Sequence, residues 1–158
     1  MNARGFTVVE TAAVVMITGI LLAITLPAAA RYRASLKGMQ ARQQLAQDLR
    51  AARQRAVTQR TPVVVRFGDG VVTTNVTTYT VHADLNGDRL VQSGERVVSH
   101  TLPTETKIEL VNLSPTDSLV FDISGVLFPG TSGGSLIVTS RAARETLLVS
   151  SAGMVYQP

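Results

Sequence analysis

Cysteine and tryptophan are absent from this 158-residue chain, and histidine occurs only twice. Without cysteine the chain has no disulfide scaffold, no thiolate site for zinc or iron–sulfur clusters, and no thiol nucleophile. Two histidines are too few for most histidine-rich metal sites. Charged residues make up only 16 % of the chain, against a typical ~25 %, and the mean hydropathy is +0.21. These values exclude a disordered polar chain, and the length fits about one domain.

The net charge of +4 and the pI near 10.1 suggest a nucleic-acid or anionic-membrane partner. The basic residues are, however, unevenly distributed. Residues 31–60 hold seven arginines and Lys37 against Asp48 alone, whereas residues 61–158 hold six basic and nine acidic side chains. The chain therefore combines a strongly basic segment with a mildly acidic domain.

A long apolar stretch covers residues 6–30 and contains Glu10 as its single charged residue. The 20 uncharged residues at positions 11–30 would span about 30 Å as a helix, which is the thickness of a bilayer core. This stretch predicts a transmembrane helix. An ionised side chain in such a span costs about 2.5–3.5 kcal/mol at the centre, less near the ends, and usually has a partner. We therefore expect Glu10 to have one.

Three interpretations of this N-terminus compete. A cleaved secretory signal is favoured by the basic N-terminal region and the A-x-A match at residues 28–30. Against it, Glu10 interrupts the apolar region, and the helical pattern continues past the supposed cleavage point. A plain membrane anchor has no use for Glu10. The third interpretation is a segment in which Glu10 itself has a function.

Helical periodicity continues beyond the apolar stretch, with an apolar stripe at positions i, i+4, i+7 and i+11. The residues of this stripe are Leu45, Leu49, Ala52 and Ala56. Few turn-forming residues interrupt positions 28–59, so one helix of roughly 50 residues is predicted. Pro27 should kink it, because proline lacks the N–H that bonds back one turn, and Thr61-Pro62 should end it.

After Pro62 the apolar period changes to two. Short segments rich in β-branched residues, separated by turn-forming clusters, predict about seven or eight antiparallel strands. The clearest are residues 63–67, 79–82, 96–100, 107–111, 119–123, 136–138 and 146–149. With the apolar stripe of the helix covering one sheet face, the sequence predicts an α+β fold with a β-rich head at residues 61–158.

The sequence Gly5-Phe6-Thr7-Val8-Val9-Glu10, followed by an unbroken apolar run, resembles the signal of type IV prepilins and type II secretion pseudopilins. The resemblance implies a leader at residues 1–5, cleavage between Gly5 and Phe6 by a prepilin peptidase, and N-methylation of Phe6. It also implies an assembly helix at residues 6–30 that includes Pro27, and a basic stalk helix at residues 31–60. Glu10 would meet the Phe6 amine of a neighbouring subunit, where the two charges offset each other's desolvation.

The sequence of the β-rich head resembles one particular family among the pilin-like proteins. A long helix followed by a β domain that contains ADLNGDRLVQSGE and ends in SSAGMVYQP is similar to H-type minor pseudopilins and FimT/FimU-like minor pilins, the GspH/FimT domain family. The resemblance implies the pilin fold and a non-enzymatic assembly subunit of a type II secretion pseudopilus or a type IV pilus. The implied partners are other pilins, the prepilin peptidase and the inner-membrane assembly platform.

The resemblance also implies the orientation of the chain. It would be a single-pass protein of the inner membrane with its head on the periplasmic side, and would later enter the filament. Counting positive charges on both sides of the span instead places the head in the cytoplasm. That rule weakens for long translocated domains, so we expect the periplasmic orientation.

Residues 84–95 carry oxygen ligands at the spacing of an EF-hand calcium loop. The candidate calcium ligands are Asp84, Asn86, Asp88, Leu90 and Glu95. The sixth position, normally glycine, is Arg89, and the flanking segments are predicted strands rather than helices. The alternative is a β-hairpin with an Asn-Gly turn joining residues 79–83 to 96–102, with or without bound calcium. No other cofactor is expected.

The basic residues support a second class of function, a DNA-binding minor pilin of a DNA-uptake pilus. The residues for this role are Arg50, Arg53, Arg55, Arg60, Arg141 and Arg144. Alternatively, the stalk arginines pair with acidic neighbours in the filament or with lipid phosphates. The acidic head disfavours DNA binding.

Two further patterns are interpreted as structural. Residues 130–134 match the G-x-S-x-G string of hydrolases, but that motif needs a following helix and a downstream histidine. Here a strand is predicted next and both histidines lie upstream, which indicates a Gly/Ser loop. His82 and His100 are expected on neighbouring strands of one hairpin as a facing structural pair. An enzyme is therefore not expected.

Overall fold

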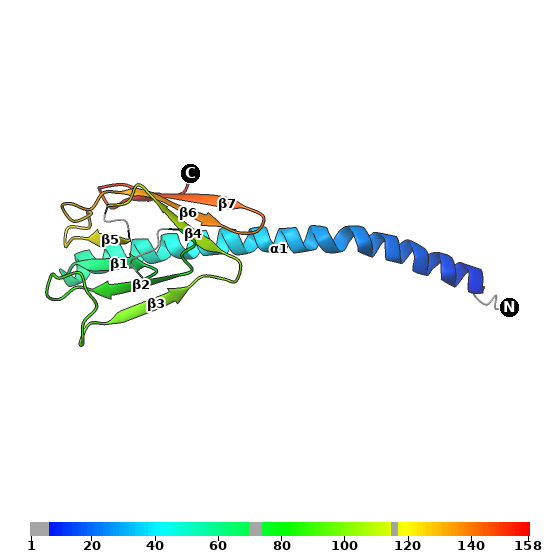
Figure 1. Ribbon diagram of the computed structural model, residues 1–158, viewed down its shortest axis with the longest axis horizontal. Coiled ribbons are helices and arrows are strands. Elements are labelled where there is room, and N and C mark those ends of the chain that lie inside the picture. The colour runs from blue at the N-terminus through cyan, green and yellow to red at the C-terminus, as the bar shows by residue number, and fades with distance from the viewer. Residues whose placement is uncertain (1–6, 70–73, 115–116) are drawn as a thin grey trace. The chain divides into compact units, whose positions relative to one another are not determined.

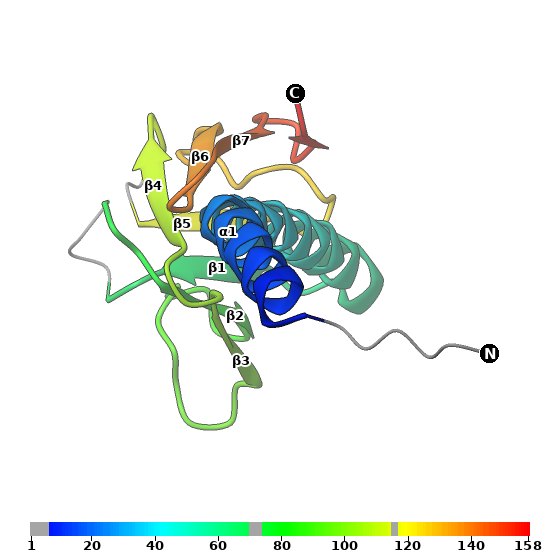
Figure 2. The same ribbon diagram turned by 90° about the vertical axis from the view of Figure 1, so that its right-hand side faces the viewer.

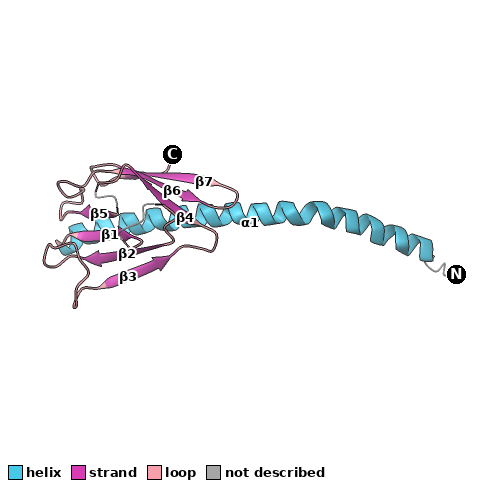
Figure 3. Cartoon of the chain, in the orientation of Figure 1, coloured by secondary structure: helices cyan, strands magenta, loops and turns pink. Residues whose placement is uncertain are grey.

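The computed structural model of the chain describes residues 7–69, 74–114 and 117–158 (Figure 1). A 52-residue helix, α1 (Val8–Gln59), comes first, and the described residues after it form short strands (Figure 3). The strands are β1 (Val63–Phe67), β2 (Thr78–Ala83), β3 (Val97–Thr101), β4 (Lys107–Val111), β5 (Ser118–Phe121), β6 (Gly134–Thr139), β7 (Arg144–Val149) and β8 (Val155–Tyr156). The chain divides into two compact units, residues 1–33 and 34–158.

The first unit is the N-terminal part of α1. It contains an 18-residue window with a mean hydropathy of 2.3, none of which is buried, so this part is long and apolar enough to cross a membrane. The hydroxyls of Thr18 and Thr25 donate to the carbonyls of Val14 and Leu21, one turn back. Polar groups of the span thus find partners within the helix, as an apolar environment requires. The helix is continuous through Pro27, and the kink expected there stays a prediction.

The second unit, the head, consists of residues 34–59 of α1 and two four-stranded sheets. The strand orders are β3-β2-β1-β5 in the first sheet and β4-β6-β7-β8 in the second, and neighbouring strands pair antiparallel. The sheets lie on two sides of this helix segment (Figure 2). The sequence predicts the antiparallel strands correctly, and the structure adds their division into two sheets.

The predicted apolar stripe of the helix forms the centre of the hydrophobic core. Leu45, Leu49, Ala52 and Ala56 are all fully buried. The same cluster contains Val63, Val65 and Phe67 from the first sheet and Ile108, Leu136 and Leu147 from the second. Each buried leucine contributes roughly 1.5–3 kcal/mol relative to an exposed one. The helix therefore joins both sheets into one core.

The end of α1 confirms the predicted stop signal. The helix ends at Gln59, and Arg60 has a φ of 51°, in the left-handed region that commonly closes a helix. Thr61 and Pro62 follow, and proline cannot continue the hydrogen-bond ladder. The chain then enters β1 directly.

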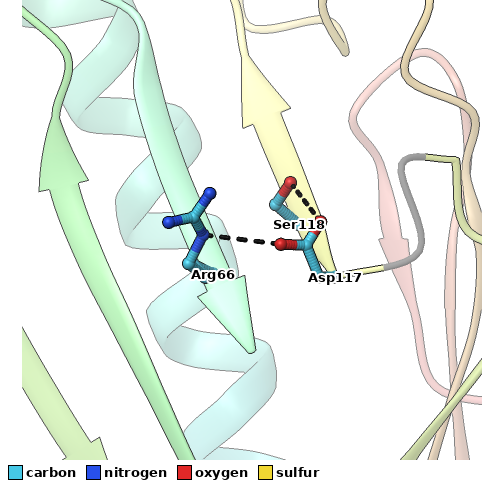
Figure 4. Close-up of polar contacts among 3 residues, drawn as sticks. All are labelled: Arg66, Asp117 and Ser118. Atoms are coloured by element: carbon cyan, nitrogen blue, oxygen red, sulfur yellow. Dashed lines mark hydrogen bonds and ion pairs between the residues drawn. The ribbon is translucent and has the colours of Figure 1, made fainter. Parts of the chain in front are cut away.

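An ion pair joins two strands on the face of the first sheet that points away from the helix. Arg66 on β1 lies 3.5 Å from the carboxylate of Asp117, immediately before β5, and the Ser118 hydroxyl donates to the same carboxylate (Figure 4). Such a partly exposed pair contributes at most about 1 kcal/mol. The pair links β1 to the beginning of β5, the edge strand of this sheet.

Candidate functional site

The predicted assembly site lies at the beginning of α1. Gly5 and Phe6 fall outside the described residues. In Glu10, carboxylate oxygen Oε2 accepts hydrogen bonds from the Thr7 backbone N–H and the Thr7 hydroxyl, both at 2.9 Å. The Glu10 N–H in turn donates to the Thr7 hydroxyl oxygen at 3.2 Å. Thr7 and Glu10 thus form a capping box, the reciprocal pairing that starts many helices.

The capping box gives Glu10 the partner that its charge requires, within its own chain. Sequence analysis missed this partner, although Thr-x-x-Glu before an apolar run is the known signature of a capping box. An ionised carboxylate offers about four lone-pair sites, and Thr7 uses two of them. The exposed Glu10 side chain can therefore accept a further donor, such as an ammonium group, while it caps the helix.

A second polar cluster joins α1 to the first sheet. The Tyr79 phenol on β2 donates to Oδ2 of Asp48 on the helix at 2.5 Å, and Nδ1 of His100 on β3 lies 3.3 Å from the same oxygen. The Tyr79 and His100 rings stack, 5.1 Å apart and inclined by 8°. Burial, together with the Asp48 carboxylate, raises the pKa of the Tyr79 phenol, so the phenol remains a proton donor. Asp48, the single acid in the basic segment, was the available signal for this cluster.

The two histidines lie on neighbouring strands as predicted, but the expectation that they face each other is wrong. His100 pairs in register with Tyr79, and His82 pairs with Val97. Successive side chains of a strand alternate between faces, so residues 79 and 82 point to opposite sides of the sheet. His82 is therefore separated from His100 by the sheet itself.

His82 is 1 % exposed, and neither ring nitrogen has a hydrogen-bond partner among the described residues. Burial lowers its pKa, while the carboxylates of Glu95 and Asp84 act in the opposite direction without reversing the shift. Burial disfavours the charged form of any base. The ring is thus kept neutral beneath an acidic loop.

The candidate calcium loop, residues 84–95, joins β2 to β3, which confirms the predicted hairpin pairing. Asp84 is buried, and its two oxygens accept hydrogen bonds from the N–H groups of Gly87 and Arg89 at 2.7 and 3.0 Å. Glu95 accepts from the N–H groups of Leu85 and Gln92 at 3.0 and 3.1 Å. The acidic side chains at both ends of the loop therefore bind its own backbone.

The middle of the loop follows the same pattern. Asp88 accepts a hydrogen bond from the Leu90 N–H at 2.8 Å and Asn86 accepts one from the Asp88 N–H at 3.3 Å. Arg89 has a φ of 62°, and its guanidinium lies 4.9 Å from the ring centre of Phe128. Within the described parts of the chain, His, Asp and Glu form no group of three that could hold a metal. Calcium binding by this loop stays a prediction.

The six arginines considered for DNA binding fall into two groups. Arg141 and Arg144, at the β6–β7 turn, pair with Glu105 at 3.1 Å and Glu109 at 2.9 Å. The neighbouring Ser140 packs against Gly38 near the start of the head helix. Arg50, the first of the helix group, comes 12 residues after Gly38, which is about 18 Å along the axis. The structure thus does not gather the six into one patch.

The helix arginines have different partners. Arg50 donates to the Val155 carbonyl at 3.2 Å, and Arg53 donates to the Gly125 carbonyl at 2.7 Å. Arg55 lines a small pocket together with Arg96. Arg60 forms the helix end described above. Because carbonyl groups are neutral, the positive charges of Arg50 and Arg53 are not cancelled by these contacts.

The G-x-S-x-G string at residues 130–134 leads into strand β6 rather than into a helix. Its Ser132 N–H donates to the Ser114 carbonyl at 2.8 Å, as part of an antiparallel bridge. The nucleophile motif requires a strand, a sharp turn and then a helix. The interpretation of this string as a loop is therefore confirmed.

The structure of this chain is similar to solved structures of one known protein. Two crystal forms of the type IV minor pilin FimU from Pseudomonas aeruginosa (strain PAO1) are similar in structure. In space group P65 FimU is 18 % identical, with a TM-score of 0.55 over 76 % of this chain and 91 % of FimU. In space group P21 it is 15 % identical, with a TM-score of 0.56 over 82 % of this chain and 90 % of FimU. The TM-scores show that the chain shares the fold of FimU.

No curated protein sequence matches the chain. The family described as Type II transport protein GspH matches residues 41–153, which is most of the head. This stretch includes the buried helix stripe and seven of the strands described above, β1 to β7. The chain therefore belongs to the GspH family and shares the fold of the minor pilin FimU.

Proposed function

We propose that this chain is a structural subunit that enters a pseudopilus or a type IV pilus by packing its N-terminal helix among those of neighbouring subunits. The observation that carries the proposal is a GspH-family head joined to an apolar helix that its own chain leaves uncovered. None of the 18-residue apolar window is buried. Apolar surface of this extent needs lipid or other helices around it. A filament subunit meets both in turn.

The N-terminus is processed in this proposal. A prepilin peptidase cleaves between Gly5 and Phe6 and the new amine of Phe6 is methylated, as the resemblance of residues 5–10 implies. Glu10 then accepts the Phe6 amine of a neighbouring subunit. The support for this role is that Glu10 caps its helix with Thr7 and keeps unused lone pairs.

The chain crosses the inner membrane once, with its head on the periplasmic side, before assembly. Among the described residues, α1 is the one helix long and apolar enough to cross a membrane, and this span and the family support the topology. Protease added to spheroplasts should degrade the head of the newly made protein. A head that stays intact until the membrane is lysed would overturn this orientation.

The test of the proposed function uses the full chain expressed with its partner pilins. We expect filaments sheared from cells, or pseudopili isolated from the envelope, to contain the chain without residues 1–5 and with one added methyl group on Phe6. Mass spectrometry of the N-terminal peptide measures both. A chain that is absent from purified filaments, or present with residues 1–5 attached, would contradict the proposal.

DNA binding is the weaker alternative. Arg141 and Arg144 are already paired with carboxylates, and the helix arginines lie elsewhere on the head. Gel shifts with duplex DNA at increasing salt provide the test. Salt-dependent retardation that is lost in Arg141→Ala/Arg144→Ala would support DNA binding, because phosphate contacts are salt-sensitive.

A further inference from the structure

A groove of about 540 Å³ opens on the head beside the last turns of α1. Its walls are the helix on one side and two backbone turns on the other, residues 122–126 and 150–154. Each turn is closed by its own hydrogen bonds: Gly125 N–H to the Asp122 carbonyl, and Gly153 N–H to the Ser150 carbonyl. The assembly site at Glu10 and the candidate calcium loop do not contribute to it.

Two glycines let the turns approach the helix closely. Gly125 and Gly153 have φ values of 79° and 72°, which disfavour any residue with a side chain. A Cβ on Gly153 would lie 2.2 Å from the Gly125 carbonyl oxygen, and one on Gly125 would lie 2.8 Å from Val57 on the helix. The groove is thus built from close-packed backbone and is preformed.

The groove is positively charged. Arg50 and Arg53 both line it. Arg50 donates to the Val155 carbonyl at the start of β8, and Arg53 donates to the Gly125 carbonyl in the first turn. These carbonyls orient the guanidinium groups without neutralising them. A guanidinium has five N–H donors, so both arginines retain donors for a carboxylate, which arginine commonly binds through two bonds.

The groove is also apolar. Val57 and Met154 line it and are 48 % and 42 % exposed. Contacts to a nucleic-acid backbone come from charged and polar groups, and exposed valine and methionine side chains offer it nothing. A peptide that carries an acidic residue next to an apolar one matches both parts of the surface.

We infer that this groove binds an acidic, apolar-flanked segment of a neighbouring pilin subunit. Its carboxylate lies against Arg50 and Arg53, and its apolar side chain packs on Val57 and Met154. This inference rests on the proposed function, because a subunit outside a filament has no such neighbour. It adds a contact between heads to the packing of the N-terminal helices.

Photo-crosslinking in assembled filaments tests the inference. The full chain carries p-benzoylphenylalanine in place of Val57, and the crosslinked peptides are identified by mass spectrometry. We expect a product with a pilin segment that contains Asp or Glu beside an apolar residue. Val97, an exposed valine of similar accessibility on edge strand β3, carries the same label in a control and should not give this product.

A second substitution links the crosslink to the charge. Arg50→Gln should lower the yield at position 57 about tenfold, the effect of losing one charge-assisted hydrogen bond. Arg144→Gln, a change of the same kind at an arginine paired with Glu109, should leave the yield unchanged. Arg50 is exposed, so its replacement tests binding without disturbing the core.

The outcomes separate this inference from the proposed function. The inference alone would be overturned if labelled chains enter filaments but give no crosslinked product. It would also be overturned if the product is a lipid or nucleotide adduct or a segment without an acidic residue, or if Arg50→Gln leaves the yield unchanged. Unlabelled chains that never enter filaments would overturn the proposed function and the inference with it.

Discussion

The phenol of Tyr79 donates a 2.5 Å hydrogen bond to the carboxylate of Asp48, across the boundary between the first sheet and the helix. The same carboxylate oxygen lies 3.3 Å from His100. Asp48 is the single acid among the basic residues of positions 31–60, and it lies on the turn between the buried Leu45 and Leu49. The helix is therefore joined to the sheet by a directional polar contact in addition to apolar packing.

Tyr79→Phe should lower the free energy of unfolding of the head by about 1–2 kcal/mol, because it removes one hydrogen bond to a charged acceptor and retains the ring. Urea unfolding of residues 34–158, which form a compact unit with its own core, measures the change. Tyr156→Phe, at an exposed tyrosine, is the matched control and should have little effect. Equal stabilities of the two variants would show that the Asp48 contact contributes nothing.

Head stability should fall as the pH drops below about 6.5, the usual histidine value. Burial lowers the pKa of His82 in the folded head, so the unfolded chain binds the proton first. The stability that the neutral His82 ring contributes is therefore fully present above pH 6.5. It is lost as the pH falls toward the lower pKa that His82 has in the folded head. Unfolding at pH 7.5 and 5.5 should show a smaller decrease in His82→Leu than in the parent protein. His100→Gln should retain the decrease; if His82→Leu retains it too, His82 is not the source.

Asp84→Ala should destabilise the head by about 1–3 kcal/mol, because two backbone N–H groups lose their acceptor in a buried place. Thermal melting in EDTA and in calcium chloride measures this loss and also tests the calcium prediction. An equal loss in both buffers identifies a hairpin loop closed by its own amides. A melting temperature that calcium raises in the parent protein, but not in Asp84→Ala, identifies a calcium loop.

Two substitutions distinguish the role of Glu10 in the helix cap from the role of its negative charge. Glu10→Gln keeps a side chain that suits a capping box but removes the charge, whereas Thr7→Ala removes the cap and keeps the charge. If Glu10 binds a neighbouring amine, Glu10→Gln should enter filaments poorly and Thr7→Ala should enter more efficiently. Quantification of each variant in sheared filaments provides the measurement.

Processing provides the control for this pair. Both variants should be cleaved after Gly5, since residues 5 and 6 are unchanged, and the size of the membrane-bound protein reports cleavage. Glu10→Gln that assembles as well as the parent would contradict the charge-pairing role. A Thr7→Ala defect as large as that of Glu10→Gln would instead assign the effect to the cap.

The helix and the strands could be predicted because their signals are local. The stripe from Leu45 to Ala56 follows the helical period, and the β-branched run that begins Val63–Phe67, directly after Pro62, is typical of a strand. The division into two sheets has no local signal. It depends on pairings between distant residues, such as Lys107 with Thr139.

The candidate sites show the same limit. The sequence places His82 and His100 on one hairpin, but only the register reveals that they lie on opposite faces. Likewise, a count of arginines cannot show that Arg144 is paired with Glu109, or that Arg53 is bound to a turn carbonyl. The Thr7–Glu10 cap is different, because its four-residue pattern is visible in the sequence.

The cap of α1 is made by Thr7 and Glu10 alone. The Glu10 carboxylate accepts hydrogen bonds from the Thr7 backbone N–H and hydroxyl, and the Glu10 N–H donates to the Thr7 hydroxyl oxygen. Every group in these three bonds belongs to residues 7 and 10, so cleavage after Gly5 would retain all of them. Maturation would then shorten the chain without unwinding the first turn of the apolar helix.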